Sequence, residues 1–263
     1  MNADFKRQQL HDWLSPPDAS FDHNKALQQR HEGTGQWFLC SNVFAEFKYD
    51  KVPFLWLHGI PGCGKTILSS SIVEDLRQES PGTASALLYF YFDFNDVAKQ
   101  TLDGALRCLI WQQACRTTKL QGVLRQLYVS HNNGRDQPST QMLCKNLQDM
   151  LLGAGRTILV LDALDECTTR PELLRWLDRL FGMSGQKPQM ILTSRKEYDI
   201  ANAIDSWVAD DAKVVLQPLD VDEDIRSYIR AVIRTEPQFD RWQARPKIRD
   251  DIEAGIMAKA NGM

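Results

Sequence analysis

The sequence lacks several features that mark whole classes of protein. Its six cysteines form no C-x-x-C pair and its five histidines are scattered, so we expect reduced cysteines and no zinc site. No apolar run approaches the roughly 18 residues that a membrane-spanning helix needs. The first nine residues are polar, without the apolar centre of a signal peptide. We therefore expect a cytoplasmic protein with no membrane partner.

The sequence also lacks an excess of positive charge. Its formal net charge is −3, which argues against a nucleic-acid groove as its main feature, so we expect no nucleic-acid partner. Its hydrophobic content of 43% and charged content of 25% are ordinary for a globular protein. A chain of 263 residues is long enough for one large domain or for a domain with a helical annex.

One stretch has the pattern of a phosphate-binding loop. Gly59 is followed, after four residues, by Gly64-Lys65-Thr66, which is the spacing of loops that bind nucleotide phosphates. The apolar run 54–57 before the loop predicts a buried strand, and apolar residues recur at helical spacing after it. Strand, glycine-rich turn and helix is the local structure that phosphate binding requires, because the backbone N–H groups and the helix N-terminus both face the anion.

The pattern assigns a role to each residue of the loop. Lys65 is expected to reach the β- and γ-phosphates, and the Thr66 hydroxyl is expected to hold Mg²⁺. Cys63 contributes only its backbone. The predicted ligand is therefore a nucleoside triphosphate or diphosphate with Mg²⁺, and the predicted nucleotide-binding residues are Gly59, Ile60, Pro61, Gly62, Cys63, Gly64, Lys65, Thr66 and Ile67.

A second apolar run ends in an acid. Residues 158–161 are Ile-Leu-Val-Leu, and Asp162 follows them. With a phosphate loop upstream, this pattern indicates a carboxylate that holds Mg²⁺ beside Thr66, although an acid that ends or caps a strand is the alternative. Asp165 or Glu166 is a candidate for placing the attacking water, and a solvated helix start is the alternative for both.

Arg195 follows a further apolar run, at 190–193. It is a candidate for sensing the γ-phosphate, and an arginine of a surface loop is the alternative. Asp93 and Asp96 also follow a strand pattern, but acids at strand ends are common and we assign them no role.

The order of elements predicts an α/β fold. We expect strands at 53–58, 86–92, 157–161, 190–193 and 213–216, alternating with helices. Before the first strand we expect helices at 1–14, at 22–30 with Asp22 as its cap, and at 36–48. Such alternation implies a mainly parallel sheet with helices on both faces and a ligand site at the carboxyl ends of the strands. Gly59, Asp93, Asp162 and Arg195 all fall at those ends.

These motifs together resemble a known family. Three motifs occur in an order that is similar to that of the NACHT class of STAND NTPases. They are the 59–66 loop, then Leu-Asp162-Ala-Leu-Asp165-Glu166, then Leu-Thr-Ser-Arg195. Two further stretches narrow the resemblance to the nephrocystin-3-like N-terminal domain of fungal NOD-like proteins. They are Arg30-His-Glu-Gly-Thr-Gly-Gln-Trp37 and Tyr89-Phe-Tyr-Phe-Asp-Phe94. The resemblance runs from about residue 10 to the end and is strongest over 33–195.

The resemblance implies a P-loop NTPase fold of the ASCE/STAND type. Its three α/β/α layers would enclose a five-stranded, mainly parallel sheet in which the strand before Arg195 lies between the loop strand and the Asp162 strand. Residues 1–32 would form a helical lead-in and residues 33–195 the NTPase core. Residues 196–263 would hold the last core strand and the start of a truncated helical subdomain. The neighbourhood of Gly33, Thr34 and Trp37 would help to hold the base.

The family's members are nucleotide-gated switches, closed with ADP and open to self-association with ATP, that act in non-self recognition or cell death. We therefore expect an adenine nucleotide as ligand and other protein chains, or further copies of this one, as partners. Those contacts would normally pass through domains that this sequence does not contain.

Three functions remain open at this point. The first is a signalling module that binds ATP or ADP with Mg²⁺ and hydrolyses ATP slowly. The second is a non-hydrolysing scaffold that nucleotide stabilises, and the third is a small-molecule kinase, for which we find no acceptor motif. A GTPase is disfavoured because the only Asn-Lys pair, at 24–25, precedes the loop, and a transporter ATPase because no Ser-Gly-Gly-Gln precedes Asp162.

Overall fold

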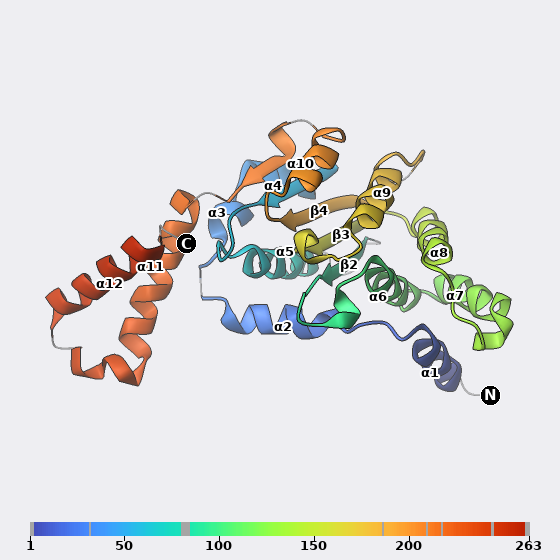
Figure 1. Cartoon of the computed structure of the whole chain (residues 1–263), viewed down its shortest axis with the longest axis horizontal. Coiled ribbons are helices and arrows are strands. Elements are labelled where there is room, and N and C mark those ends of the chain that lie inside the picture. The colour runs from blue at the N-terminus through green and yellow to red at the C-terminus, as the bar shows by residue number, and fades with distance from the viewer. Residues whose placement is uncertain are drawn as a thin grey trace.

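Five short apolar runs form the strands of one sheet in the computed structural model of this chain, which describes residues 3–31, 33–79, 85–185, 187–208, 210–216, 218–242 and 245–260. The strands are β1 (Phe54–His58), β2 (Ala86–Tyr91), β3 (Thr157–Asp162), β4 (Gln189–Ser194) and β5 (Lys213–Val215). Their order is β2-β3-β4-β1-β5, and each pairing within the described residues is parallel. The predicted parallel sheet is confirmed, with β4 between β1 and β3 (Figure 1).

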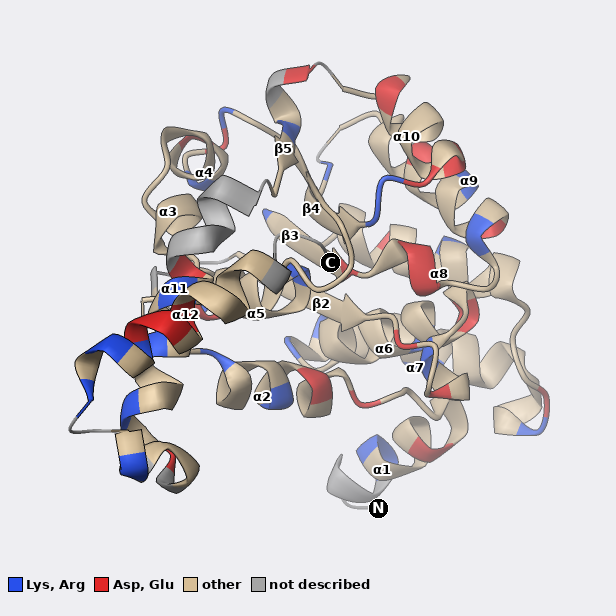
Figure 2. Ribbon diagram, turned by 60° about the vertical axis from the view of Figure 1, so that its left-hand side comes forward, with Lys and Arg blue, Asp and Glu red and all other residues tan. Residues whose placement is uncertain are grey.

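The strands are buried because helices cover both faces of the sheet. Every residue of β1, β3 and β4 is buried, whereas the edge strand β5 is partly exposed. Uninterrupted apolar runs are what such doubly covered strands require. Figure 2 shows the strands almost entirely in tan, with the charged residues on helices and connections.

Helices alternate with the strands and extend beyond them at both ends. They are α1 (Ala3–Leu14), α2 (Ala19–Gln29), α3 (Gln36–Leu39), α4 (Asn42–Lys48), α5 (Lys65–Glu79), α6 (Leu102–Ala114), α7 (Thr118–Ser130), α8 (Thr140–Leu152), α9 (Arg170–Phe181), α10 (Tyr198–Asp205), α11 (Pro218–Thr235) and α12 (Pro246–Ala260). None of them, in the described part of the chain, is both long enough and apolar enough to cross a membrane.

Two apolar clusters lie on opposite faces of the sheet. Phe54 and Trp56 of β1 point into a cluster with residues of α1 and α6 to α10. Leu55 and Leu57 point into a second cluster with α3, α4 and α5. Alternate residues of one strand therefore serve opposite layers, and the molecule has an α/β/α arrangement.

Two predictions about the lead-in helices are wrong. The N-cap of α2 is Asp18, whose carboxylate accepts the Ser20 N–H at 2.8 Å, and not Asp22. Asp22 instead lies 2.6 Å from the buried Lys99 ammonium. The segment 36–48 is two helices. The first, α3, ends at Leu39 with Cys40 as its C-cap, and the Ser41 side chain then caps α4 by accepting the Phe44 N–H. The apolar spacing alone does not reveal a cap within the run.

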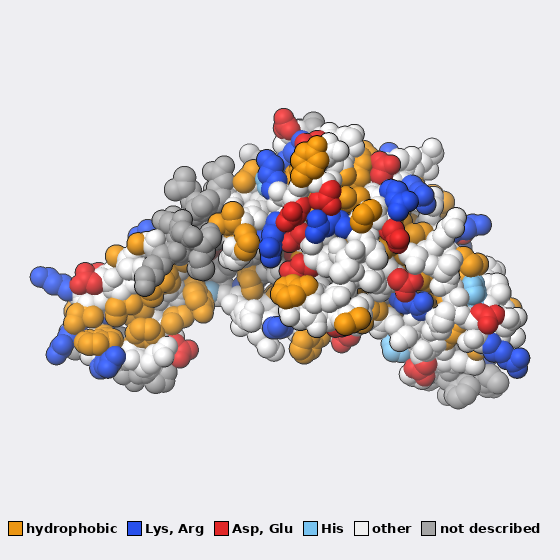
Figure 3. All heavy atoms as spheres, in the orientation of Figure 1, with side chains coloured by type: hydrophobic (Ala, Val, Ile, Leu, Met, Phe, Trp, Pro, Cys, Tyr) orange, Lys and Arg blue, Asp and Glu red, His pale blue; other side chains and the backbone are white. Residues whose placement is uncertain are grey.

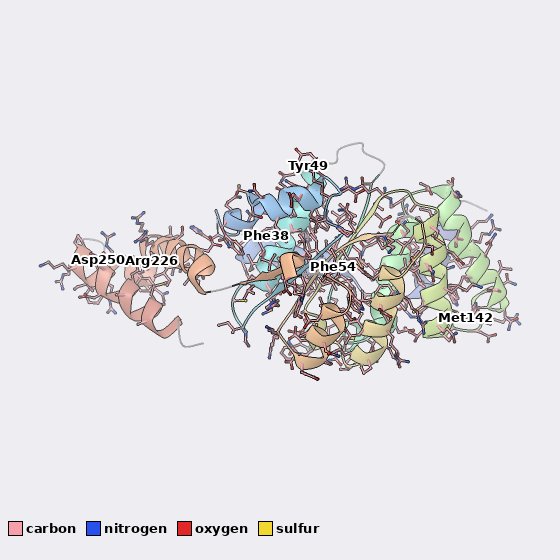
Figure 4. All side chains as sticks on the ribbon, turned by 90° about the horizontal axis from the view of Figure 1, so that it is seen from above. Phe38, Tyr49, Phe54, Met142, Arg226 and Asp250 are labelled. Atoms are coloured by element: carbon pink, nitrogen blue, oxygen red, sulfur yellow. The ribbon has the colours of Figure 1, made fainter. Side chains whose placement is uncertain are left out.

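The last two helices form a hairpin that projects from one end of the molecule (Figure 1). Its small core contains Ile229, Ile233 and Met257. Figure 3 shows apolar side chains along the hairpin, and Tyr228 is 51% exposed. In Figure 4, the labelled Arg226 and Asp250 lie at the opposite end of the molecule from Met142 of α8.

Candidate functional site

The glycine-rich loop, residues 59–64, joins β1 to α5 at the carboxyl edge of the sheet. Gly62 and Gly64 have φ values of 78° and 84°, a left-handed conformation that favours glycine. A Cβ on Gly59 would lie 2.7 Å from the Cys63 sulfur, so this glycine is required by close packing. At Gly62 and Gly64 a Cβ would meet nothing within 4 Å, which leaves open space in front of the loop.

Lys65, the first residue of α5, closes the loop on itself. Its ammonium donates to the carbonyl oxygens of Gly59 at 3.0 Å and Ile60 at 2.8 Å, and lies 3.6 Å from the Cys63 sulfur. Ile60 and Pro61 are exposed at the tip of the loop, and Cys63 is buried beneath it. Three of the predicted loop residues, Gly59, Ile60 and Cys63, thus contact the Lys65 ammonium.

Thr66, Asp162 and Thr193 form a chain of hydrogen bonds across three elements. The Thr66 hydroxyl donates to Oδ2 of Asp162 at 2.7 Å, and the Thr193 hydroxyl donates to Oδ1 at 2.6 Å. Asp162 is 1% exposed, and this burial raises the pKa of its carboxyl group, against the opposing effects of both hydroxyls and of Lys65. The predicted proximity of Thr66 and Asp162 is present in the structure.

Asp165 binds Arg195. Oδ1 of Asp165 accepts the Arg195 backbone N–H at 2.9 Å, and Oδ2 lies 3.1 Å from Nε of Arg195. The Asp165 side chain is 6% exposed and that of Arg195 is 46% exposed. The structure therefore brings these two predicted residues together, with both carboxylate oxygens of Asp165 engaged.

Glu166 lies in the same short 3₁₀ turn as Asp165 but faces a different segment. Its Oε2 accepts the Phe94 N–H at 3.0 Å, which ties the turn to the connection after β2. Burial is the largest cause of the raised pKa of the Glu166 carboxyl group, and neighbouring carboxylates act in the same direction. A carboxylate held in partial burial beside other acids is suited to accept a proton.

A cavity of about 420 Å³ opens beside the loop. It is bounded by the lead-in segment, by the loop with the start of α5, and by α11; the lining residues include Gln29, His31, Thr34, Gly35, Trp37, Gly62, Cys63, Gly64, Ile67, Leu68, Leu216, Asp224, Ile225 and Tyr228. Thr34 and Trp37, predicted to lie near the base, thus face this cavity. Gly33 is not one of the lining residues.

The part of the site that comes from α11 was not predicted from the sequence. Asp224 accepts the Gly35 N–H at 2.8 Å, and the Tyr228 ring meets the His31 ring edge-on at 6.3 Å. These pairs are far apart in the sequence, and no local pattern indicates them. Thr193 was also missed, because a threonine at the end of an apolar run is an ordinary strand residue.

Asp93 and Asp96 serve the local backbone. Oδ1 of Asp93 accepts the Asn95 N–H at 2.8 Å, and Oδ1 of Asp96 accepts the Ala98 N–H at 3.0 Å at the start of a 3₁₀ turn. Such bonds are typical of short polar residues in turns.

Comparison with known proteins identifies one relative and one family for this chain. The sequence is 28% identical to the vegetative incompatibility protein HET-E-1 of Podospora anserina over 177 residues, which are 65% of this chain and 13% of that protein. The chain therefore matches only a small part of this relative. The family described as nephrocystin 3, N-terminal, matches residues 33–195, a range that contains the loop, Asp162 and Arg195. The chain belongs to the nephrocystin 3, N-terminal family.

Proposed function

We propose that this chain is the nucleotide-binding module of a STAND-type signalling switch, which binds ATP or ADP with Mg²⁺ and hydrolyses ATP slowly. The observation that carries the proposal is the meeting of Lys65, Thr66 and Asp162 at one edge of the sheet, with Thr66 Oγ1 2.7 Å from Asp162 Oδ2. The similarity to a vegetative incompatibility protein supports a role in non-self recognition or cell death.

The glycine-rich loop supplies the phosphate site. Its open face has no side chain at Gly62 or Gly64, so a phosphate can approach the backbone N–H groups closely. The N-terminus of α5 adds the favourable end of a helix dipole. Lys65, which now donates to two loop carbonyls, would exchange them for phosphate oxygens. Lys65 would thereby exchange hydrogen bonds to neutral carbonyl oxygens for ion pairs with an anionic phosphate.

The residues present fit a magnesium ion. Thr66 and Asp162 offer a hydroxyl and a carboxylate, which are the hard oxygen ligands that Mg²⁺ prefers. The described residues contain no group of three or more His, Cys, Asp or Glu side chains that could hold a metal by themselves. This suits Mg²⁺, which is usually held by one or two side chains together with phosphate and water. When bound, it would neutralise charge on the phosphates.

For hydrolysis, water attacks the γ-phosphorus and the bond to the bridging oxygen of the β-phosphate breaks. Both carboxylate oxygens of Asp165 are engaged by Arg195, whereas Glu166 meets Phe94 through Oε2. We therefore assign the placing of water to Glu166 and the holding of Arg195 to Asp165. The loop and Lys65 would stabilise the charge that develops on the phosphoryl oxygens.

Thermal unfolding of the purified chain, with and without Mg²⁺-ATP or Mg²⁺-ADP, tests nucleotide binding. Ligand at a hundred times its dissociation constant adds about 2.7 kcal/mol to the free energy of unfolding. For a chain of this size the midpoint should rise by roughly 5–10 °C. The rise should vanish in Lys65→Ala and persist in Lys51→Ala, which removes an exposed lysine just before β1. A folded chain whose midpoint moves with neither nucleotide contradicts the proposal.

A second function is favoured by one observation. Both carboxylate oxygens of Asp165 and Oε2 of Glu166 already have partners within the protein, which leaves less of the two carboxylates for activating water than a fast hydrolase would need. A non-hydrolysing scaffold, stabilised by nucleotide for contact with other chains, would have the same binding site. Phosphate release from ATP separates the two functions, because the scaffold predicts binding without turnover.

A further inference from the structure

Thr193, at the carboxyl end of β4, occupies a position that no catalytic motif assigns. Its side chain is fully buried. The hydroxyl uses its one proton on Asp162 Oδ1, at 2.6 Å, and accepts the Ala163 N–H at 3.0 Å. A single buried hydroxyl thus bonds both the acid and the backbone that directly follows it.

The hydrogen bond between the Ala163 N–H and the Thr193 hydroxyl supports an unusual backbone conformation at Ala163. Ala163 has a φ of 57°, a left-handed conformation that costs energy for any residue with a Cβ. The turn it forms leads directly into Asp165 and Glu166. The Thr193 hydroxyl therefore holds the turn that places these two acids, in addition to the carboxylate before it.

The hydrogen bond from Thr193 to Oδ1 also determines which oxygen of the Asp162 carboxylate faces Thr66. Because Thr193 occupies Oδ1, the other oxygen, Oδ2, is the one that meets Thr66 at 2.7 Å. The hydrogen bond from Thr193 thus fixes which carboxylate oxygen of Asp162 faces the loop.

The end of β4 is itself held rigidly. The buried Trp56 indole N–H of β1 donates to the Ser194 hydroxyl at 2.9 Å, and that hydroxyl donates to the Arg195 carbonyl at 2.7 Å. Arg195 in turn binds Asp165 through its backbone and side chain. Residues 193 to 195 therefore fasten the 162–165 segment to β4 beyond the last strand pairing, which joins Leu161 to Leu192.

We infer that Thr193 is a positioning residue for the magnesium site: its hydroxyl orients the Asp162 carboxylate toward Thr66 and sets the turn that carries Asp165 and Glu166. The inference rests on the proposed nucleotide function. Beyond that function, the inference states that cation affinity depends on the Thr193 hydroxyl, which would contact neither the nucleotide nor the cation. Residues that orient a metal ligand from behind are typically worth 10–100-fold in metal affinity.

The test compares Thr193→Val, which keeps the shape of the side chain but removes the hydroxyl, with Thr193→Ser, which keeps the hydroxyl. At a fixed ADP concentration, Mg²⁺ is titrated and the thermal midpoint is recorded against a chelator baseline. We expect Thr193→Val to need about ten-fold more Mg²⁺ for half of the full midpoint rise. Thr193→Ser should stay within about three-fold of the original chain.

Thr157→Val is the matched control. Thr157 is also buried, at the amino end of β3, and its hydroxyl donates to the Gly155 carbonyl at 3.3 Å, away from the site. It should leave the Mg²⁺ requirement unchanged. Hydrogen exchange at the Ala163 amide gives a second measurement, independent of nucleotide, because this amide loses its acceptor only in Thr193→Val.

The outcomes are distinct. An unchanged Mg²⁺ requirement in Thr193→Val, or an equal loss in Thr193→Ser, overturns the inference while nucleotide binding by the original chain stands. If the original chain itself shows no midpoint rise with Mg²⁺-ADP, the proposed function fails, and the role of Thr193 toward magnesium fails with it. A ten-fold loss confined to the valine variant supports both.

Discussion

At the scale of single residues, two neighbouring acids are predicted to differ in function. Glu166→Gln should lower ATP turnover at least 100-fold, because the variant loses the group that we propose places the water. Asp165→Asn should lower turnover less. It should instead reduce the free energy of unfolding by about 1–3 kcal/mol, since the Asp165 side chain is 6% exposed and paired with Arg195. Phosphate release and denaturant unfolding of both variants provide the measurements.

The reverse ranking, with Asp165→Asn the more damaging to turnover and neutral for stability, contradicts these assignments. Single-residue patterns predicted the two acids but could not separate them, because the partner of Asp165 is 30 residues away, at Arg195. Lys65, Thr66 and Asp162 were predictable because motif spacing and strand ends place them. Thr193 was not, because its only local signal is that of a strand residue.

At the scale of elements, His23 joins α2 to α5 and β2. Its ring is 1% exposed, with Nδ1 3.0 Å from the Tyr91 hydroxyl and Nε2 3.1 Å from Oε1 of Glu74. Arg77 also approaches Nε2, at 3.0 Å. Burial lowers the pKa of His23 below its ordinary 6.5, and Arg77 adds to this effect, whereas Glu74 opposes it. The joint between the three elements is therefore built for a neutral imidazole.

The consequence is a stability that falls in mild acid. Below pH 6.5 the unfolded chain takes up a proton that the folded chain resists, so the free energy of unfolding decreases as pH falls from 6.5 toward the lower folded pKa. His58, whose pKa is also lowered mainly by burial, acts in the same direction. Each such proton contributes at most about 1.4 kcal/mol per pH unit. Denaturant unfolding at pH 7.5, 6.5 and 5.5 should show this decrease.

The variant His23→Gln should be less stable at pH 7.5 but less sensitive to acid than the original chain. His11→Gln is the control, since His11 lies on α1 with its side chain 41% exposed. An acid sensitivity of His23→Gln equal to that of the original chain would mean that the decrease arises elsewhere. Of the elements that meet at His23, β2 and α5 were predicted from their apolar residues and α2 was predicted with the wrong cap. The junction of these elements was not predicted, because His23 is separated in the sequence from Glu74 by 51 positions and from Tyr91 by 68 positions.

At the scale of the whole molecule, the position of β4 between β1 and β3 followed from the family resemblance, and the helices on both faces of the sheet followed from the alternation of strands and helices along the chain. The projecting α11–α12 hairpin follows from neither, although its helical pattern was predicted. The hairpin meets the core at the cavity beside the loop, where Asp224 of α11 accepts the Gly35 N–H at 2.8 Å. A ligand in that cavity would touch the lead-in segment, the loop and the hairpin together.

We therefore predict that Asp224 helps to set the position of the hairpin against the core. A hydrogen bond to a carboxylate contributes about 1.5–3 kcal/mol, so Asp224→Ala should shift the balance toward a detached hairpin by ten-fold or more. Hydrogen exchange at the Gly35 amide should accelerate by a similar factor. The radius of gyration from X-ray scattering should rise. Asp251→Ala, which removes an exposed acid from α12, should change neither quantity. Equal exchange at Gly35 in the two variants would show that packing alone positions the hairpin, in which case the proposed binding of nucleotide could not be transmitted to the hairpin through Asp224.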